Sequence, residues 1–62
     1  MSWVWVDTAF NNLNQAARKN EYCEEFTNSK KDLSDLCLKL AKAGIVYNVR
    51  NMPGGVYKVY NA

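Results

Sequence analysis

The fold is decided by the stretch SKKDLSDLCLKLAKAGIVYNVRNMPGGVYKVY, residues 29–60. Its first half has the i, i+3, i+4, i+7 apolar spacing of an amphipathic helix, predicted from about Ser29 to Ala43. Ser29 and Asp32 match the acidic form of a capping box at the start of this helix. Gly44 suits the left-handed residue that commonly ends a helix. The apolar stripe consists of Leu33, Leu36, Cys37, Leu40 and Ala41.

The second half, residues 45–60, predicts a β-hairpin that turns at Pro53-Gly54-Gly55. Pairing Val49 with Tyr57 keeps the apolar side chains of both strands on one face, because a slip of one residue would reverse the faces. This register requires an extra residue in the ladder, and we place that bulge at Gly55. The opposite face would then carry Val46, Asn48, Arg50, Lys58 and Tyr60.

The first 26 residues add three predicted elements. Trp3–Val6 is aromatic and β-branched throughout, which favours a short strand. Asp7 or Thr8 would then cap a helix that reaches about Asn20. Residues 21–26 alternate, with Tyr22, Glu24 and Phe26 on one side and Cys23 and Glu25 on the other, and we predict a second strand there.

These elements give the order β-α-β-α-β-β and an α+β fold class. The natural packing is a small three- to four-stranded sheet with two helices on one face, ending in the hairpin. The other face of the sheet would stay open. With 62 residues the chain is predicted to be a single domain, 1–62.

Composition excludes several classes of protein. No apolar run approaches the roughly 20 residues that span a membrane, and the first residues lack the features of a signal peptide. We therefore expect a complete, cytoplasmic chain without membrane association. Cys23 and Cys37 are expected to be reduced and buried, and without His they cannot complete a zinc site. No metal or other cofactor is expected.

Charge is distributed unevenly along the chain. Residues 1–29 carry four acidic and two basic side chains, whereas residues 30–62 carry six basic and two acidic ones. Cations beside aromatic rings on an open sheet face can hold phosphates and stack bases, and a helix amino terminus attracts anions. An ordinary solvated hairpin and a capped helix would explain the same residues. The candidate nucleic-acid-binding residues are Lys30, Lys31, Asn48, Arg50, Lys58 and Tyr60.

Aromatic residues suggest a second kind of site. A chain this small cannot easily bury two Trp, four Tyr and two Phe at once, so some aromatic surface should remain for a partner. Trp3 and Trp5 would share one face of the first predicted strand, either in the core or in an interface. The candidate protein-interface residues are Trp3, Trp5 and Tyr22.

The segment Phe10–Tyr60 resembles the amino-terminal domain of small-subunit ribosomal protein eight. The resemblance rests on Leu13 to Ala17, Tyr22 to Phe26, Ser29-Lys30, Leu33 to Leu40 and Gly44-Ile45-Val46. It implies a helix, a strand, a second helix and a hairpin, in a family associated with RNA. The proline that commonly precedes the Ser-Lys pair is replaced by Asn28, and the family's RNA-contacting carboxyl-terminal domain has no counterpart in these 62 residues.

A second resemblance is to the winged helix, in which a leucine-rich helix also ends in Gly-Ile-Val before a hairpin wing. A winged helix needs a further helix before the wing, and residues 21–26 are too short and too β-like to supply both a strand and a helix.

Together these features predict a small binding module that is not an enzyme. There is no His, no metal set and no base to activate either Cys. We narrowly prefer RNA, or another nucleic acid, as the partner. The alternative is a protein-interaction module, such as a host-directed viral inhibitor or a homodimer, joined through the exposed aromatics and the amino-terminal strand. The size is compatible with a viral or phage accessory protein.

Overall fold

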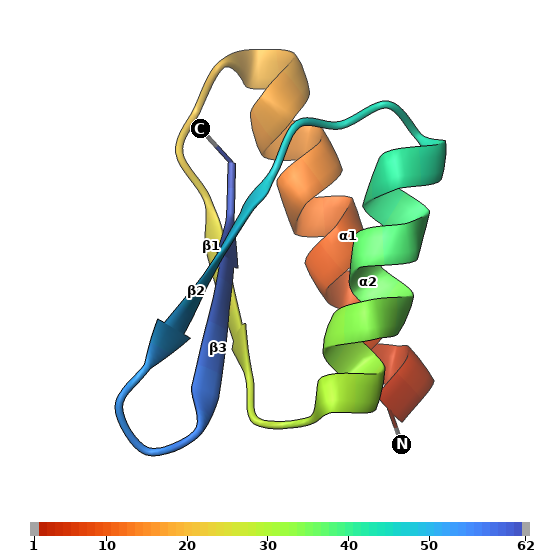
Figure 1. Cartoon of the computed structure of the whole chain (residues 1–62). Helices are drawn as coiled ribbons and strands as arrows, with labels where there is room; N and C mark the ends of the chain where they lie inside the picture. Colours follow the sequence, from red (N-terminus) through yellow and green to blue (C-terminus); the bar gives the residue numbers. More distant parts are fainter. Residues whose placement is uncertain (1, 62) are drawn as a thin grey trace.

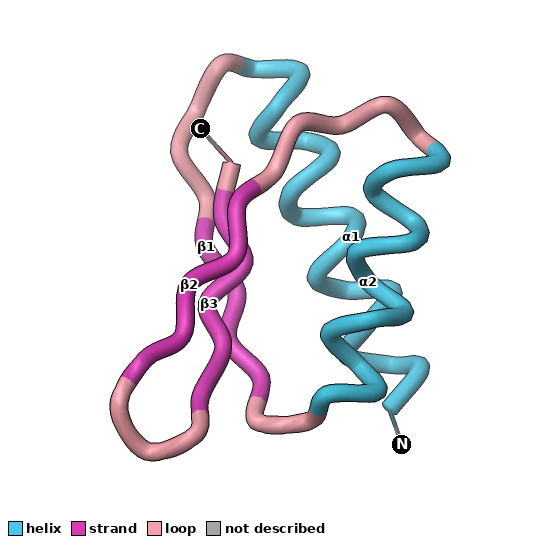
Figure 2. Tube along the Cα trace, in the orientation of Figure 1, coloured by secondary structure: helices cyan, strands magenta, loops and turns pink. Residues whose placement is uncertain are grey.

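A computed structural model describes residues 2–61 of the chain, with side chains described from Val4 to Asn61. Two helices form one layer and a three-stranded antiparallel sheet forms the other (Figures 1 and 2). The predicted α+β class, with two helices on one face of a small sheet and a carboxyl-terminal hairpin, is confirmed. The elements in chain order are α1 (Ser2–Lys19), β1 (Glu24–Thr27), α2 (Lys30–Lys42), β2 (Asn48–Met52) and β3 (Val56–Tyr60).

The predicted strand at Trp3–Val6 is wrong, because α1 already begins at Ser2. Val6, Ala9, Leu13 and Ala16 lie at helical spacing and are all buried, the first three completely. Their packing outweighs the local β-propensity of the first residues, as tertiary contacts commonly do. The element order is therefore α-β-α-β-β, and the helix expected from Asp7 or Thr8 starts more than a turn earlier.

Both helices end in a left-handed residue. Gly44 has φ +73°, and Ile45 donates its backbone N–H to the carbonyl five residues earlier at 3.0 Å. Asn20 has φ +56°, and Glu21 makes the equivalent bond at 2.9 Å. These bonds define Schellman caps, which confirms the predicted end of α2 and gives α1 the same kind of end.

The strand order is β1-β3-β2, so β3 lies at the centre of the sheet. Val49 pairs with Val59, two residues away from the predicted Tyr57. The hairpin loop has three residues, Pro53–Gly55, and Gly55 has φ +75°, so the extra residue lies at Gly55 as predicted, but it shifts the partner of Val49 to Val59 and not to Tyr57. A shift of two residues keeps every side chain on its face, and the predicted division of the two faces therefore holds.

The core lies between the helices and the inner face of the sheet. Its completely buried members are Val6, Ala9, Leu13, Leu36, Leu40 and Val59. Ile45 and Tyr47 are half-buried against this cluster and precede β2, whereas Val46 points out with 73% of its surface exposed. Neither helix is long and apolar enough for a membrane span among the residues described.

Candidate functional site

The candidate site is the open face, which we define as the sheet surface turned away from α1 and α2 (Figure 1). Strand register places residues on it in rows: Phe26, Lys58 and Arg50 form one row. The neighbouring row is Glu24, Tyr60 and Asn48. Val56 and Met52 complete the face toward the hairpin loop. The four hairpin residues predicted to bind nucleic acid, Asn48, Arg50, Lys58 and Tyr60, are therefore neighbours on one surface.

Lys58 is held in place by its neighbours on the open face. Its Nζ lies 3.6 Å from Glu24 Oε1 and 4.9 Å from the centre of the Tyr60 ring, and only 17% of its side chain is exposed. The carboxylate and the ring face both attract the ammonium group. Arg50, directly opposite Lys58, is exposed and has no ion pair with a described residue.

Tyr22 extends the same network beyond the end of β1. Its hydroxyl donates a hydrogen bond to Glu24 Oε1 at 2.7 Å, and its ring lies 6.3 Å from that of Tyr60 at an angle of 48°. The bond to Glu24, with a smaller contribution from desolvation, raises the pKa of the Tyr22 hydroxyl above its ordinary value. Tyr22 is 62% exposed, so its ring is available to a partner.

Phe26 is a residue of this face that the sequence-based site did not include. It is 45% exposed and pairs with Lys58 across β1 and β3. The alternation of residues 21–26 placed Phe26 beside Tyr22 and Glu24, but it carried no information on which strand β1 would join. The open face therefore combines three aromatic rings, two cations and one carboxylate.

Lys30 and Lys31 do not belong to the open face. They begin α2, in the helix layer on the other side of the sheet, at the end of the molecule where the hairpin also turns (Figure 1). Lys31 Nζ forms an ion pair with Asp35 Oδ2 at 3.2 Å. The predicted phosphate-binding helix end is thus a separate surface with one cation already paired.

The predicted protein interface is not brought together. Its amino-terminal strand is part of α1, and Trp5 is half-buried against the core. The side chain of Trp3 lies outside the described residues. Tyr22 follows the other end of α1, and a helix of 18 residues at about 1.5 Å per residue is roughly 27 Å long. Trp5 and Tyr22 therefore cannot share one compact patch.

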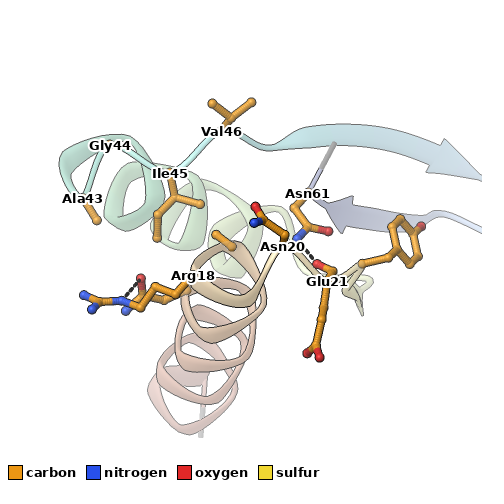
Figure 3. A pocket seen from close by; sticks show the side chains of 11 residues that line it. Arg18, Asn20, Glu21, Ala43, Gly44, Ile45, Val46 and Asn61 are labelled. Carbon is orange, nitrogen blue, oxygen red and sulfur yellow. Dashed lines mark hydrogen bonds between the residues drawn. The ribbon is translucent and has the colours of Figure 1, made fainter.

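A cavity of about 780 Å³ lies where both helices end (Figure 3). Arg18 and Glu21 line it with opposite charges, and Ile45 and Val46 give it an apolar side. Arg18 donates a hydrogen bond to Asn14 Oδ1 at 3.4 Å. Because its two opposite charges balance, this cavity singles out no class of ligand.

Both cysteines are free and half-buried. Burial, followed by the charge of Glu25, raises the pKa of the Cys23 thiol, which donates to Glu25 Oε2 at 3.6 Å. Burial also raises the pKa of Cys37, although a hydrogen bond with Tyr47 opposes that effect. A thiol whose pKa is raised stays protonated at neutral pH, and because the thiolate is the nucleophile, such a thiol reacts poorly there. The described residues contain no cluster of three His, Cys, Asp or Glu side chains that could hold a metal ion.

The fold and the open face together define a small α+β domain with an uncovered sheet surface of mixed cationic and aromatic character. No protein-family model, curated protein or solved structure matches this chain.

Proposed function

We propose that the protein is a non-enzymatic module that binds single-stranded nucleic acid on its open face, with RNA preferred over DNA. The observation that carries the proposal is the row Phe26–Lys58–Arg50 beside Tyr60 on an uncovered sheet. Unstacked bases pack on aromatic rings of this kind while neighbouring cations contact the phosphates. A duplex hides the faces of its bases, so these rings would not reach them.

Two features support RNA as the preferred strand. Glu24 and Asn48 flank Tyr60 in its row, where they offer acceptor and donor groups beside a stacked nucleotide. The ribose 2′-hydroxyl, which both donates and accepts, distinguishes RNA at such a position. The order helix, strand, helix, hairpin is also compatible with the resemblance to ribosomal protein eight, an argument by analogy. Residues 2–61 have one helix between β1 and β2, which leaves the winged-helix resemblance without its extra helix.

Stacking, more than charge, should carry the affinity. Glu24 offsets one of the two cations, so the open face has a small net charge, and aromatic stacking contributes about 1–3 kcal/mol per base. Each phosphate contact to a single strand changes log K by roughly −0.7 per unit of log salt concentration. With at most Arg50 and Lys58 in contact with phosphates, we expect a slope of about −1.4. This slope is much smaller in magnitude than that of a strongly basic protein.

The test is fluorescence anisotropy with short mixed-sequence RNA, its DNA equivalent and a duplex, between about 50 and about 200 mM salt. Phe26→Ala should weaken binding to RNA roughly tenfold or more, with little change in the salt slope. Arg50→Ala should reduce the magnitude of the salt slope by about 0.7. Lys30→Ala, which removes a cation of the helix layer, should leave the slope unchanged. Absence of binding at low salt, equal binding of the duplex, or an unaffected Phe26→Ala variant would overturn the proposal.

A protein partner on the same face is the second candidate, favoured by the exposure of Tyr22 and Phe26 at 62% and 45%. Exposed aromatic rings are typical anchors of protein interfaces. Binding of this kind, including formation of a homodimer, would be nearly indifferent to salt. Analytical ultracentrifugation at low and high salt therefore separates the two candidates.

A further inference from the structure

We infer that the protein has a second binding site, for an organic ammonium cation, in a pocket beside Asp32 where β1 leads into α2; Phe26 belongs both to this pocket and to the open face. The pocket has a volume of about 430 Å³, within the range of roughly 300–1,000 Å³ of small-molecule sites. Its lining joins both layers of the fold and consists of Trp5, Phe26, Thr27, Asn28, Asp32 and Val56.

The start of α2 leaves the carboxylate of Asp32 without its expected partner. In a capping box the side chain of this residue would accept the backbone N–H of Ser29. Here Thr27 Oγ1 accepts that N–H at 3.1 Å, while Ser29 Oγ accepts the backbone N–H of Asp32 at 3.2 Å. The helix is therefore capped without the Asp32 carboxylate, which is left free for another role.

Asp32 is also shielded from water. Only 8% of the residue is exposed, and its Oδ1 is buried with no hydrogen-bond partner among the residues whose side chains the structure describes. A buried carboxylate that lacks a donor is unfavourable unless a cation compensates it. The dipole of α2 supplies part of that compensation but no donor. Lys31, the adjacent cation in the chain, is paired with Asp35 instead.

The aromatic side chains around Asp32 select the chemical class of the missing cation. Trp5, which is half-buried, and Phe26, which is partly exposed, line the pocket together with Asp32. Ring faces attract ammonium groups within about 6 Å, and Trp does so most strongly. Ca²⁺ and Mg²⁺ need several oxygen ligands, which one carboxylate, one amide and one hydroxyl do not provide well. A primary or methylated ammonium group on a small amine fits both the carboxylate and the rings.

The test is a proton–nitrogen correlation NMR titration of the full chain with propylammonium and tetramethylammonium chlorides, at ionic strength held constant with sodium chloride. Neutral 1-propanol is the matched probe without charge. We expect saturable shifts of the Trp5 indole N–H and the Asp32 amide with the cations, and at least about tenfold weaker binding of propanol. Equal binding of propanol would show a merely apolar hollow, and no saturable shift would show no site. Either result overturns the inference.

Two matched variants locate the charge that is responsible. Asp32→Asn keeps the shape of the side chain and the backbone bond to Ser29, and should weaken ammonium binding at least about tenfold. Asp35→Asn makes the same change three residues further along α2, on a carboxylate paired with Lys31, and should leave binding unchanged. Equal effects of the two variants would overturn the inference, and the comparison of propylammonium with propanol on the unaltered chain decides it even if Asp32→Asn fails to fold.

This site shares Phe26 with the open face but does not require that the protein bind nucleic acid. Arg50→Ala, which removes a cation of the open face, should leave the ammonium titration unaltered. Failure of nucleic-acid binding and failure of ammonium binding are therefore distinguishable in the same set of proteins.

Discussion

Asn61 is a buried polar residue that ties the end of β3 to the link between α1 and β1. Its Oδ1 accepts the backbone N–H of Cys23 at 2.8 Å. Its Nδ2 donates to the carbonyl of Glu21 at 2.7 Å (Figure 3). Its own backbone N–H donates to the carbonyl of Cys23 at 3.3 Å. Replacing Asn61 with alanine should therefore loosen the sheet from the first helix.

The magnitude follows from the two side-chain bonds. Each contributes a net stability of about 1 kcal/mol, so Asn61→Ala should cost about 2 kcal/mol. The cost stays near this value because Glu21 is exposed and Cys23 is half-buried. Water can therefore bond in part to the Glu21 carbonyl and the Cys23 N–H that lose their partner. For a domain of this size 1 kcal/mol lowers Tm by about 4–8 °C, which gives a loss of about 8–16 °C.

Urea unfolding followed by far-UV circular dichroism measures this difference. Asn51→Ala is the control, because Asn51 is exposed on β2, and it should change the free energy of unfolding by less than about 0.5 kcal/mol. Asn61→Asp keeps the acceptor for Cys23 but brings a carboxylate oxygen against the Glu21 carbonyl, and should be at least as unstable as Asn61→Ala. The reasoning is refuted if Asn61→Ala matches the control, or if Asn61→Asp is as stable as the unaltered protein.

Three further changes test other parts of the fold. Leu13→Ala, at a completely buried core position, should cost about 2–5 kcal/mol in urea unfolding, whereas Val4→Ala, at a 67% exposed position, should cost less than about 0.5 kcal/mol. Gly44→Ala should cost about 1–2 kcal/mol although nothing lies within 4 Å of the added Cβ, because φ is +73°. The pKa of Cys23 is raised, which means that the folded protein holds the thiol proton more tightly than the unfolded chain does. The stability that this proton contributes is complete below the ordinary pKa of 9.0 and is lost as pH rises through the raised pKa. Urea unfolding between about pH 8 and about pH 10 should show this loss, and Cys23→Ala should reduce it.

The second helix and the hairpin could be predicted because their signals are local. Ser29, Gly44 and the apolar stripe between them define α2 within one residue at each end. The predicted strand at Trp3–Val6 was wrong because a local signal was outweighed by packing between distant parts of the chain. Its β-propensity is also local, but Val6 continues a stripe with Ala9, Leu13 and Ala16 that forms only when α1 packs against α2 and the sheet. The spacing was visible in the sequence, whereas its weight against propensity depended on contacts far along the chain.

The candidate site was predictable to the extent that it follows strand periodicity. Asn48, Arg50, Lys58 and Tyr60 share a face in any register that differs by two residues, so the error in the hairpin pairing did no harm. The pairing of β1 with β3 joins segments about thirty residues apart and leaves no local signal. Glu24 and Phe26 as neighbours of Lys58 therefore emerge only from the structure.

The environment of Lys58 bears on the choice between a binding face and an ordinary solvated hairpin. A solvated lysine extends into water and keeps its rotamer freedom, which costs energy to restrict when a ligand binds. Lys58 instead has 17% of its side chain exposed, between Glu24 and the Tyr60 ring, and Tyr22 in turn bonds to Glu24. A ligand that used this face would meet a cation and rings already ordered, so little further entropy would be lost on binding. That pre-organisation supports the proposal of a binding surface over an ordinary solvated hairpin, and it is the property that would let a face with so little net charge bind bases.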